Sequence, residues 1–139
     1  MNKWTNISRF VALPAVAVAA AVGVTAPAEA ASSHGCPSGY VCIYPQNAGW
    51  NNNKPEQPLY YRYGWYNLHG QLGTHRVFDN QTGGASVFLC YGYGGTGGYA
   101  TQIPAPRVQD LNLTPINSIV LTPTTSASPS PCASHPTPS

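Results

Sequence analysis

Short runs of β-branched and aromatic residues recur along the sequence from about residue 40 onward. Such runs are typical of strands, and the same region has no apolar stripe at the spacing of a helix. Residues 86–90 also alternate, with Val87 and Leu89 on one face of the expected strand. Phe88 and Cys90 then lie on the opposite face. The pattern predicts strands at residues 41–44, 59–63, 75–78, 86–91, 99–103 and 118–121.

Clusters of Gly, Pro and Asn separate these runs. Many short strands with frequent turns indicate an all-β fold, a small Greek-key sandwich in which two sheets pack together. We expect residues 31–122 to form one such domain. A domain of this size buries a modest fraction of its surface, so disulfides and large aromatic side chains have to supply part of its stability.

Residues 1–30 have the composition of an export signal. Lys3 and Arg9 precede an apolar run that is too short, and too interrupted by proline, to span a membrane. Ala28-Glu29-Ala30 then fits a cleavage site, so we expect a secreted, extracellular chain with no membrane segment after cleavage. The mature part has four positive and three negative side chains, a net charge of +1, and therefore no basic face for nucleic acid.

Residues 123–139 are mostly Pro, Ser, Thr and Ala, a composition that predicts a disordered tail. The tail also contains Cys132, one of four cysteines that allow three pairings. We favour Cys36 with Cys42, because the Pro and Gly between them let the chain fold back tightly. Cys90 then remains for Cys132, a pairing that would tie the tail down, while the alternative of Cys36 with Cys90 stays open. The cysteine spacing does not fit a zinc site.

A catalytic set is difficult to assemble from this sequence. Ser86, His75 and Asp79 have the residue types of a nucleophile, a base and an orienting acid. Ser86 lies in no nucleophile-elbow motif, however, and is more simply a turn residue. The carboxylates are few and scattered, which argues against acid–base hydrolysis and against a tight metal site. We therefore expect no enzyme, no catalytic residues, no metal and no cofactor.

Residues 60–66 form the densest aromatic cluster. Alternation along the expected strand places Tyr61 and Tyr63 on the same face. We favour a structural role for these rings, because so much of a small core has to be aromatic. Tyr61, Tyr63 and Trp65 are nevertheless the candidates for an exposed surface that stacks on sugars or contacts a partner.

Three stretches resemble the small secreted bacterial metalloproteinase inhibitors: Cys36-Pro-Ser-Gly-Tyr-Val-Cys42-Ile-Tyr44, Ser86-Val-Phe-Leu-Cys90-Tyr91 and Tyr99-Ala100-Thr101. The resemblance implies a βγ-crystallin-like fold and an extracellular protease as partner. In that family the inhibitory bond follows the cysteine that matches Cys90. The resemblance therefore implies a substrate-like inhibitory loop formed by Cys90, Tyr91, Gly92 and Tyr93.

The chain departs from the family in this loop. The family closes the loop with a second cysteine a few residues on, where this chain has Gly95 and Thr96. A flexible loop loses affinity because each backbone residue costs about 1–2 kcal/mol to fix. Rigidity then has to come from neighbouring packing or from Cys132 reaching Cys90. The alternative function is a non-inhibitory extracellular structural module, or one that binds cell-wall glycan through its aromatic face.

Overall fold

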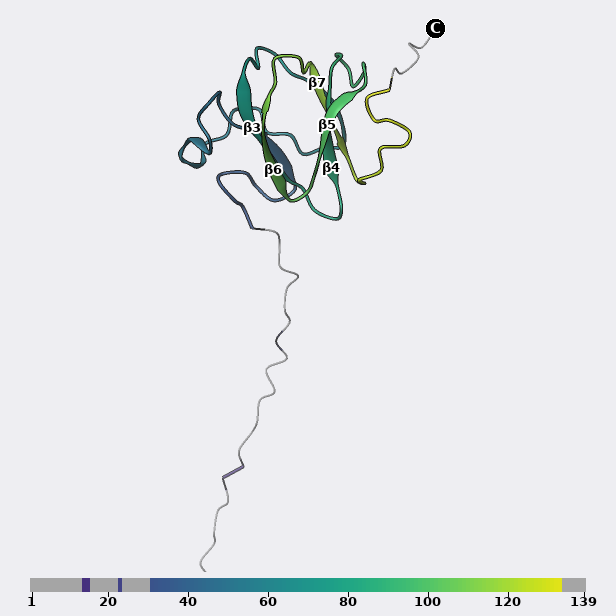
Figure 1. The fold of residues 1–139 in the computed structure, drawn as a ribbon. Helices are drawn as coiled ribbons and strands as arrows, with labels where there is room; N and C mark the ends of the chain where they lie inside the picture. Colours follow the sequence, from purple (N-terminus) through teal and green to yellow (C-terminus); the bar gives the residue numbers. More distant parts are fainter. Residues whose placement is uncertain (1–13, 16–22, 24–30, 134–139) are drawn as a thin grey trace, which may run out of the picture.

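Seven strands form two antiparallel sheets in the computed structural model, which describes residues 14–15, 23 and 31–133 (Figure 1). The strands are β1 (Tyr40–Ile43), β2 (Gly64–Asn67), β3 (Thr74–Asn80), β4 (Ser86–Cys90), β5 (Tyr99–Pro104), β6 (Arg107–Asn112) and β7 (Ser118–Thr122). A short 3-10 turn, η1, covers Asn51–Asn53. The all-β class predicted from the sequence is confirmed.

The first three strands and the last four strands exchange one strand: β2 joins the sheet of β4, β5 and β7, and β6 joins the sheet of β1 and β3. One sheet has the order β1-β3-β6 and the other β2-β7-β4-β5. Strands β4 and β5 form a hairpin, β6 crosses to the first sheet, and β7 returns to pair with β4. Strand β2 crosses in the opposite sense and pairs with β7 at the edge of the second sheet. This exchange holds the two sheets together as one body.

The main core lies between the sheets. Val87 and Leu89 of β4 point into it, as the alternation predicts, and each is fully buried. The other sheet supplies Val77, and the ends of the sandwich are closed by Leu68 and Leu113. The core is therefore mainly aliphatic, whereas the sequence suggested a mainly aromatic one.

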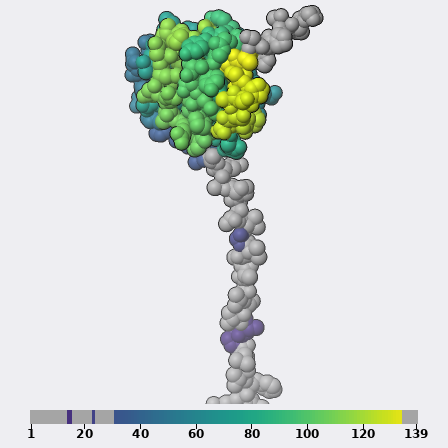
Figure 2. All heavy atoms as spheres, turned by 45° about the vertical axis from the view of Figure 1, so that its right-hand side comes forward, coloured from purple at the N-terminus to yellow at the C-terminus, as the bar shows by residue number. Residues whose placement is uncertain are grey.

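A second small core covers the outer face of the second sheet. Phe88, Cys90 and Val120 point away from the main core, yet all are buried, because residues 123–133 lie over them. We call residues 123–133 the strap; it is yellow in Figure 2, flat against the body of the molecule. A disulfide joins Cys90 to Cys132 of the strap, and the Cα atoms of these two residues lie 5.5 Å apart. The Cα atoms of Cys36 and Cys42, which form the other disulfide of the described residues, lie 5.9 Å apart.

The expectation of a disordered tail is wrong for the strap. Its backbone is bonded to the sheet: the Ser86 hydroxyl donates to the Thr124 carbonyl at 2.8 Å, and the Gln102 amide donates to the Thr125 carbonyl at 2.8 Å. Composition alone misled because the strap gains its order from a disulfide and from polar contacts, which do not require apolar residues of its own. The remainder of the expected tail, residues 134–139, lies outside the described residues.

A third cluster covers the outer face of the first sheet. Here the disulfide between Cys36 and Cys42 packs with Tyr44 and Phe78, and Trp50 closes the cluster from the side. The Tyr44 hydroxyl donates to the backbone carbonyl of residue 34 at 2.7 Å, which holds the incoming chain in place. Both sheets thus have a segment bound to their outer face by a disulfide.

One predicted strand is wrong, and two strands of the structure, β2 and β6, were not predicted. The expected strand at residues 59–63 is wrong: Tyr60 makes an isolated bridge to Val41, and the chain then leaves that edge. Gly64, with a φ of 129°, lets it turn toward the second sheet, where β2 begins. Strand β6 was missed because its residues are mostly exposed and polar, so its pairing with β3 left no apolar pattern.

The expected export signal, residues 1–30, lies almost entirely outside the described residues. Across the part of the chain that the structure describes, none of the elements is a helix of the length and apolarity needed to cross a bilayer.

We predict that the two disulfides stabilise the domain unequally. In the chain-entropy model, the 42-residue separation of Cys90 and Cys132 contributes about 4 kcal/mol, against about 2 kcal/mol for the 6-residue separation of Cys36 and Cys42. Denaturant unfolding of the two double Cys→Ser variants measures the difference. Equal losses for both variants would contradict the assignment of the larger role to the strap disulfide.

Candidate functional site

The β4–β5 loop, residues 91–98, is closed by its own backbone. The amide of Tyr91 donates to the Gly98 carbonyl at 3.1 Å. The amide of Gly92 donates to the Thr96 carbonyl at 2.8 Å. These two hydrogen bonds continue the β4–β5 hairpin into the loop.

Two side chains from neighbouring strands hold the far side of the loop. Asn67, the last residue of β2, accepts from the Gly94 amide through Oδ1 at 2.7 Å. Ser118, the first residue of β7, accepts from the Gly95 amide through Oγ at 2.9 Å. The loop is therefore anchored to β7, which pairs with β4, and to β2, the next strand of the same sheet.

The carbonyl groups at the start of the loop are also bonded. Asn117 donates from its backbone amide to the Cys90 carbonyl at 3.0 Å and from Nδ2 to the Tyr91 carbonyl at 2.6 Å. The Ser118 hydroxyl donates to the Gly92 carbonyl at 2.6 Å. Neighbouring packing thus supplies the rigidity that a second loop cysteine supplies in the inhibitor family.

The structure separates the predicted inhibitory residues into a buried and an exposed part. Cys90 is fully buried, joined to Cys132, and its carbonyl belongs to the hydrogen-bonded sheet end. Tyr91 and Tyr93 are 47% and 57% exposed, and Gly92 between them is half-buried. The accessible surface of the loop therefore begins at Tyr91, while the peptide carbonyl of Cys90 faces the protein.

The loop rests directly on β2. Gly95, with a φ of 70°, is buried against Trp65 and Val120, and an added Cβ would lie 3.1 Å from the Trp65 Cβ and 3.0 Å from Val120. No other residue type fits this position without a shift of the loop. The Tyr93 ring stacks with His69 at a centroid distance of 6.3 Å.

The three aromatic candidates are all exposed, but they do not form one face. Tyr61, Tyr63 and Trp65 are 49%, 56% and 54% exposed. Tyr61 packs against Tyr40 beside the first sheet, whereas Trp65 lies on the outer face of the second sheet opposite Val120. Trp65 is therefore the candidate that stands next to the loop.

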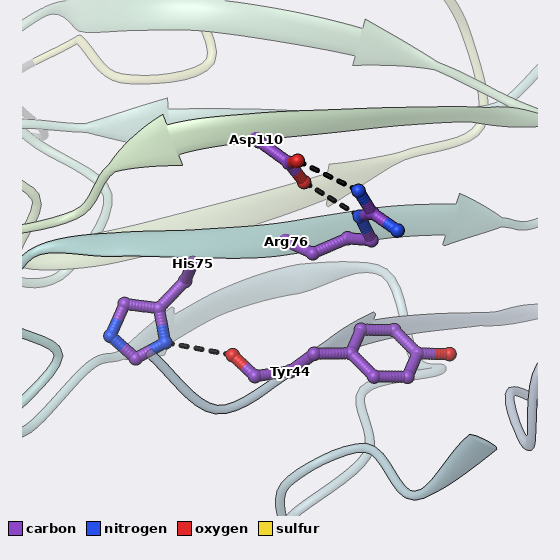
Figure 3. A network of polar contacts seen from close by, with 4 residues as sticks. All are labelled: Tyr44, His75, Arg76 and Asp110. Carbon is purple, nitrogen blue, oxygen red and sulfur yellow. Dashed lines mark hydrogen bonds and ion pairs between the residues drawn. The ribbon is translucent and has the colours of Figure 1, made fainter. Parts of the chain in front are cut away.

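A cluster of polar contacts lies on the first sheet (Figure 3). Arg76 of β3 and Asp110 of β6 are direct cross-strand partners and form two hydrogen bonds, at 2.7 and 2.8 Å. The Arg76 guanidinium also lies 4.6 Å from the centre of the Trp50 ring. The hydrogen bonds from Arg76 lower the pKa of Asp110. The two hydrogen bonds thus join β6 to β3 through side chains as well as through the backbone.

The residues considered for catalysis do not meet. His75 is buried with its ring nitrogens 2.8 Å from the Tyr44 carbonyl and 3.0 Å from the Leu72 carbonyl (Figure 3). The Ser86 hydroxyl donates to a carbonyl of the strap, and Asp79 accepts from the Gln81 amide at 3.0 Å. Among the described residues, no three His, Cys, Asp or Glu side chains are placed so that they could hold a metal ion.

The residues that hold the loop were not found from the sequence. Asn67, Asn117 and Ser118 stand at or next to strand ends, and each contacts a backbone group 23 to 27 residues away along the chain. A polar pair before an apolar run, as in Asn117-Ser118, is the one local signal, and it is shared with ordinary turns.

Comparisons of the chain with family models, with curated proteins and with solved structures found no match.

We predict that Ser118→Ala loosens the β4–β5 loop. The change removes the bonds to the Gly92 carbonyl and the Gly95 amide, and unpaired groups of this kind cost about 1–3 kcal/mol. Amide hydrogen exchange in residues 91–98 should become faster by about tenfold or more, since about 1.4 kcal/mol corresponds to a factor of ten. Ser126→Ala, at an exposed hydroxyl of the strap, is the matched control. Unchanged exchange in the loop would contradict the role given to Ser118.

We predict that Asp79 makes the fold more stable in acid. Burial raises the pKa of Asp79 to about 6, and the Gln81 and Val87 amides that bond to it reduce the effect. Because the folded pKa exceeds the unfolded value of 3.8, this stabilisation is complete below about pH 4 and is lost as the pH rises to about 6. The loss is at most about 3 kcal/mol. Denaturant unfolding at pH 4 and pH 7 measures it.

Asp79→Asn should remove this part of the pH dependence, since the amide oxygen still accepts from the Gln81 amide and carries no charge. An identical difference between the two pH values in the wild type and the variant would show that Asp79 is not its source.

Proposed function

We propose that the chain is an exported, non-catalytic binding protein that presents the β4–β5 loop to a protein partner. More specifically, we propose a peptidase inhibitor whose partner is an extracellular metalloprotease. The observation that carries the proposal is the combination of a hydrogen-bonded loop backbone with two exposed tyrosines, Tyr91 and Tyr93.

Rigidity is the property that such a loop needs. Binding a flexible segment costs about 1–2 kcal/mol for each backbone residue that becomes fixed. In this loop the carbonyls of Cys90, Tyr91 and Gly92 and the amides of Gly94 and Gly95 are already bonded. Little of the binding free energy is therefore lost to ordering the loop, as in a preorganised inhibitor.

The topology supports the family resemblance. Strands β4, β5 and β7 adjoin in one sheet while β6 lies in the other, and β7 returns beside β4, which is the path of a Greek key. Strands β1, β2 and β3 repeat the exchange in the opposite direction. A βγ-crystallin-like Greek-key sandwich is therefore part of the proposal. Export is part of it too, because disulfides persist in oxidising compartments.

The contact with the protease is assigned to side chains and not to the Cys90–Tyr91 peptide. Cys90 is fully buried and its carbonyl accepts from Asn117, so a catalytic metal has no approach to it in this conformation. Tyr91 and Tyr93 instead offer two large rings with little conformational freedom, which suits them as interface anchors. The chain then occludes a cleft without being cleaved.

We predict inhibition of a thermolysin-like protease that depends on Tyr91 and Tyr93. Replacing either ring by Ala should weaken inhibition on the order of tenfold or more, as expected for an interface anchor. Initial rates on a peptide substrate, titrated with the chain, measure the effect.

Tyr63→Ala is the matched control. Tyr63 is about as exposed as Tyr93, but it lies just before the first residue of β2, whereas the loop is bonded to Asn67, the last residue of β2. Mass analysis after prolonged incubation should find the peptide after Cys90 intact. Absence of inhibition at about 100 µM chain, where even a weak complex with a Kd near 1 µM is saturated, would refute the proposal.

A further inference from the structure

A groove runs between the edge of the second sheet and the strap. Its volume is about 640 Å³, within the range of about 300–1,000 Å³ that is typical of ligand sites. Trp65 and Val120 line the groove on the side of the sheet, and strap residues that include Ser126, Ser128 and Ser130 line it on the other side. The groove includes Gly64 and Trp65 of β2 and adjoins the β4–β5 loop, because Gly95 of the loop packs against Trp65 and Val120.

Trp65 is a large side chain of this face that the strap leaves open. The strand register places Trp65 opposite Val120, and Val120 opposite Phe88, so the three form a row across the sheet. Phe88 is fully buried and Val120 is 9% exposed beneath the strap, but Trp65 is 54% exposed. A flat indole surface therefore borders the groove.

The lining of the groove is uncharged and mostly apolar, and the strap adds hydroxyl groups to it. The strap contributes Ser and Thr hydroxyls together with prolines, and none of the described lining residues is ionisable. The Ser126 hydroxyl is already engaged, because it donates to the Ser128 carbonyl at 3.1 Å. The hydroxyls of Ser128 and Ser130 make no hydrogen bond within the described part of the chain, so they are available to a ligand.

We propose that this groove binds a neutral carbohydrate chain, with Trp65 as its stacking platform. The apolar face of a pyranose ring matches an exposed aromatic ring, and its hydroxyl groups match the donors and acceptors of the strap. An ionic ligand would lose hydration without finding an opposite charge, since the lining is uncharged. The uncharged lining thus favours a neutral ligand, and the indole ring together with the strap hydroxyls favours one that has both an apolar face and hydroxyl groups.

Both walls are formed before the ligand arrives. The strap is fixed by the Cys90–Cys132 disulfide and by the hydrogen bonds of Ser86 and Gln102 to its backbone. The Trp65 side belongs to strand β2, which is paired with β7 along its whole length. A preformed groove lowers the entropy cost of binding, which matters for a weakly held sugar.

The experiment titrates the full mature chain with hexamers of neutral sugars: cello-, xylo-, malto- and chito-oligosaccharides. Tryptophan fluorescence reports on Trp65, while Trp50 is enclosed between Arg76 and the ring of His34 and serves as an internal reference. We expect at least one series to bind with a Kd of about 1 mM or tighter, and Trp65→Ala to weaken it on the order of tenfold. Trp65→Phe should retain part of the affinity, and Tyr63→Ala should bind as the wild type does.

The binding should change little with added salt, and an anionic oligogalacturonate should not compete, because the groove carries no charge. Thermal unfolding of each variant establishes that it is folded. The proposal is overturned if the folded wild type binds none of the four series at about 10 mM, ten times the expected Kd. It is also overturned if Trp65→Ala binds as tightly as the wild type, or if a proline-rich peptide binds through Trp65 while no sugar does. The protease assay is independent of all these results.

Discussion

Strand β4 is buried on both faces, and the rest of the molecule depends on how its second face is covered. Val87 and Leu89 enter the core between the sheets, which two packed sheets always provide. Phe88 and Cys90 face outward and would be exposed in a bare sandwich. The strap covers them and is held there by the Cys90–Cys132 disulfide. A domain with limited core area thereby gains a second apolar layer, and the same covering produces the groove beside Trp65.

The end of β4 also connects the fold to the proposed site. Cys90 carries the disulfide on its side chain and a sheet hydrogen bond on its carbonyl, and the exposed loop begins at the next residue. Asn117 and Ser118 at the start of β7 then hold the loop backbone. The Cys90–Cys132 disulfide fixes the residue before the loop, and the two polar side chains fix the loop itself. The loop and the groove adjoin at Trp65 and Val120, which line the groove and also contact Gly95 of the loop.

The sequence predicted the elements whose residues carry a local signal. The alternating apolar residues of β4 and the β-branched run of β7 were placed correctly, and so was the all-β class. Strand β6 has no such signal, because its pairing depends on backbone bonds and on the Arg76–Asp110 pair. The order of the strap was missed for a related reason, since its stabilising contacts are formed with residues far away in the sequence. The support of the loop by Asn117 and Ser118 is likewise a property of the assembled sheets.

The strap also imposes an order of events on biosynthesis. Strands β5, β6 and β7 and the strap all lie between the two cysteines of the longer disulfide, so all of them must leave the ribosome and reach an oxidant before that bond can form. Until the bond forms, Phe88 and Val120 are not held beneath the strap, and the outer face of the sheet exposes apolar side chains that promote aggregation. A chain interrupted after β7 would retain every strand and still be prone to aggregation, with an unpaired thiol at the end of β4.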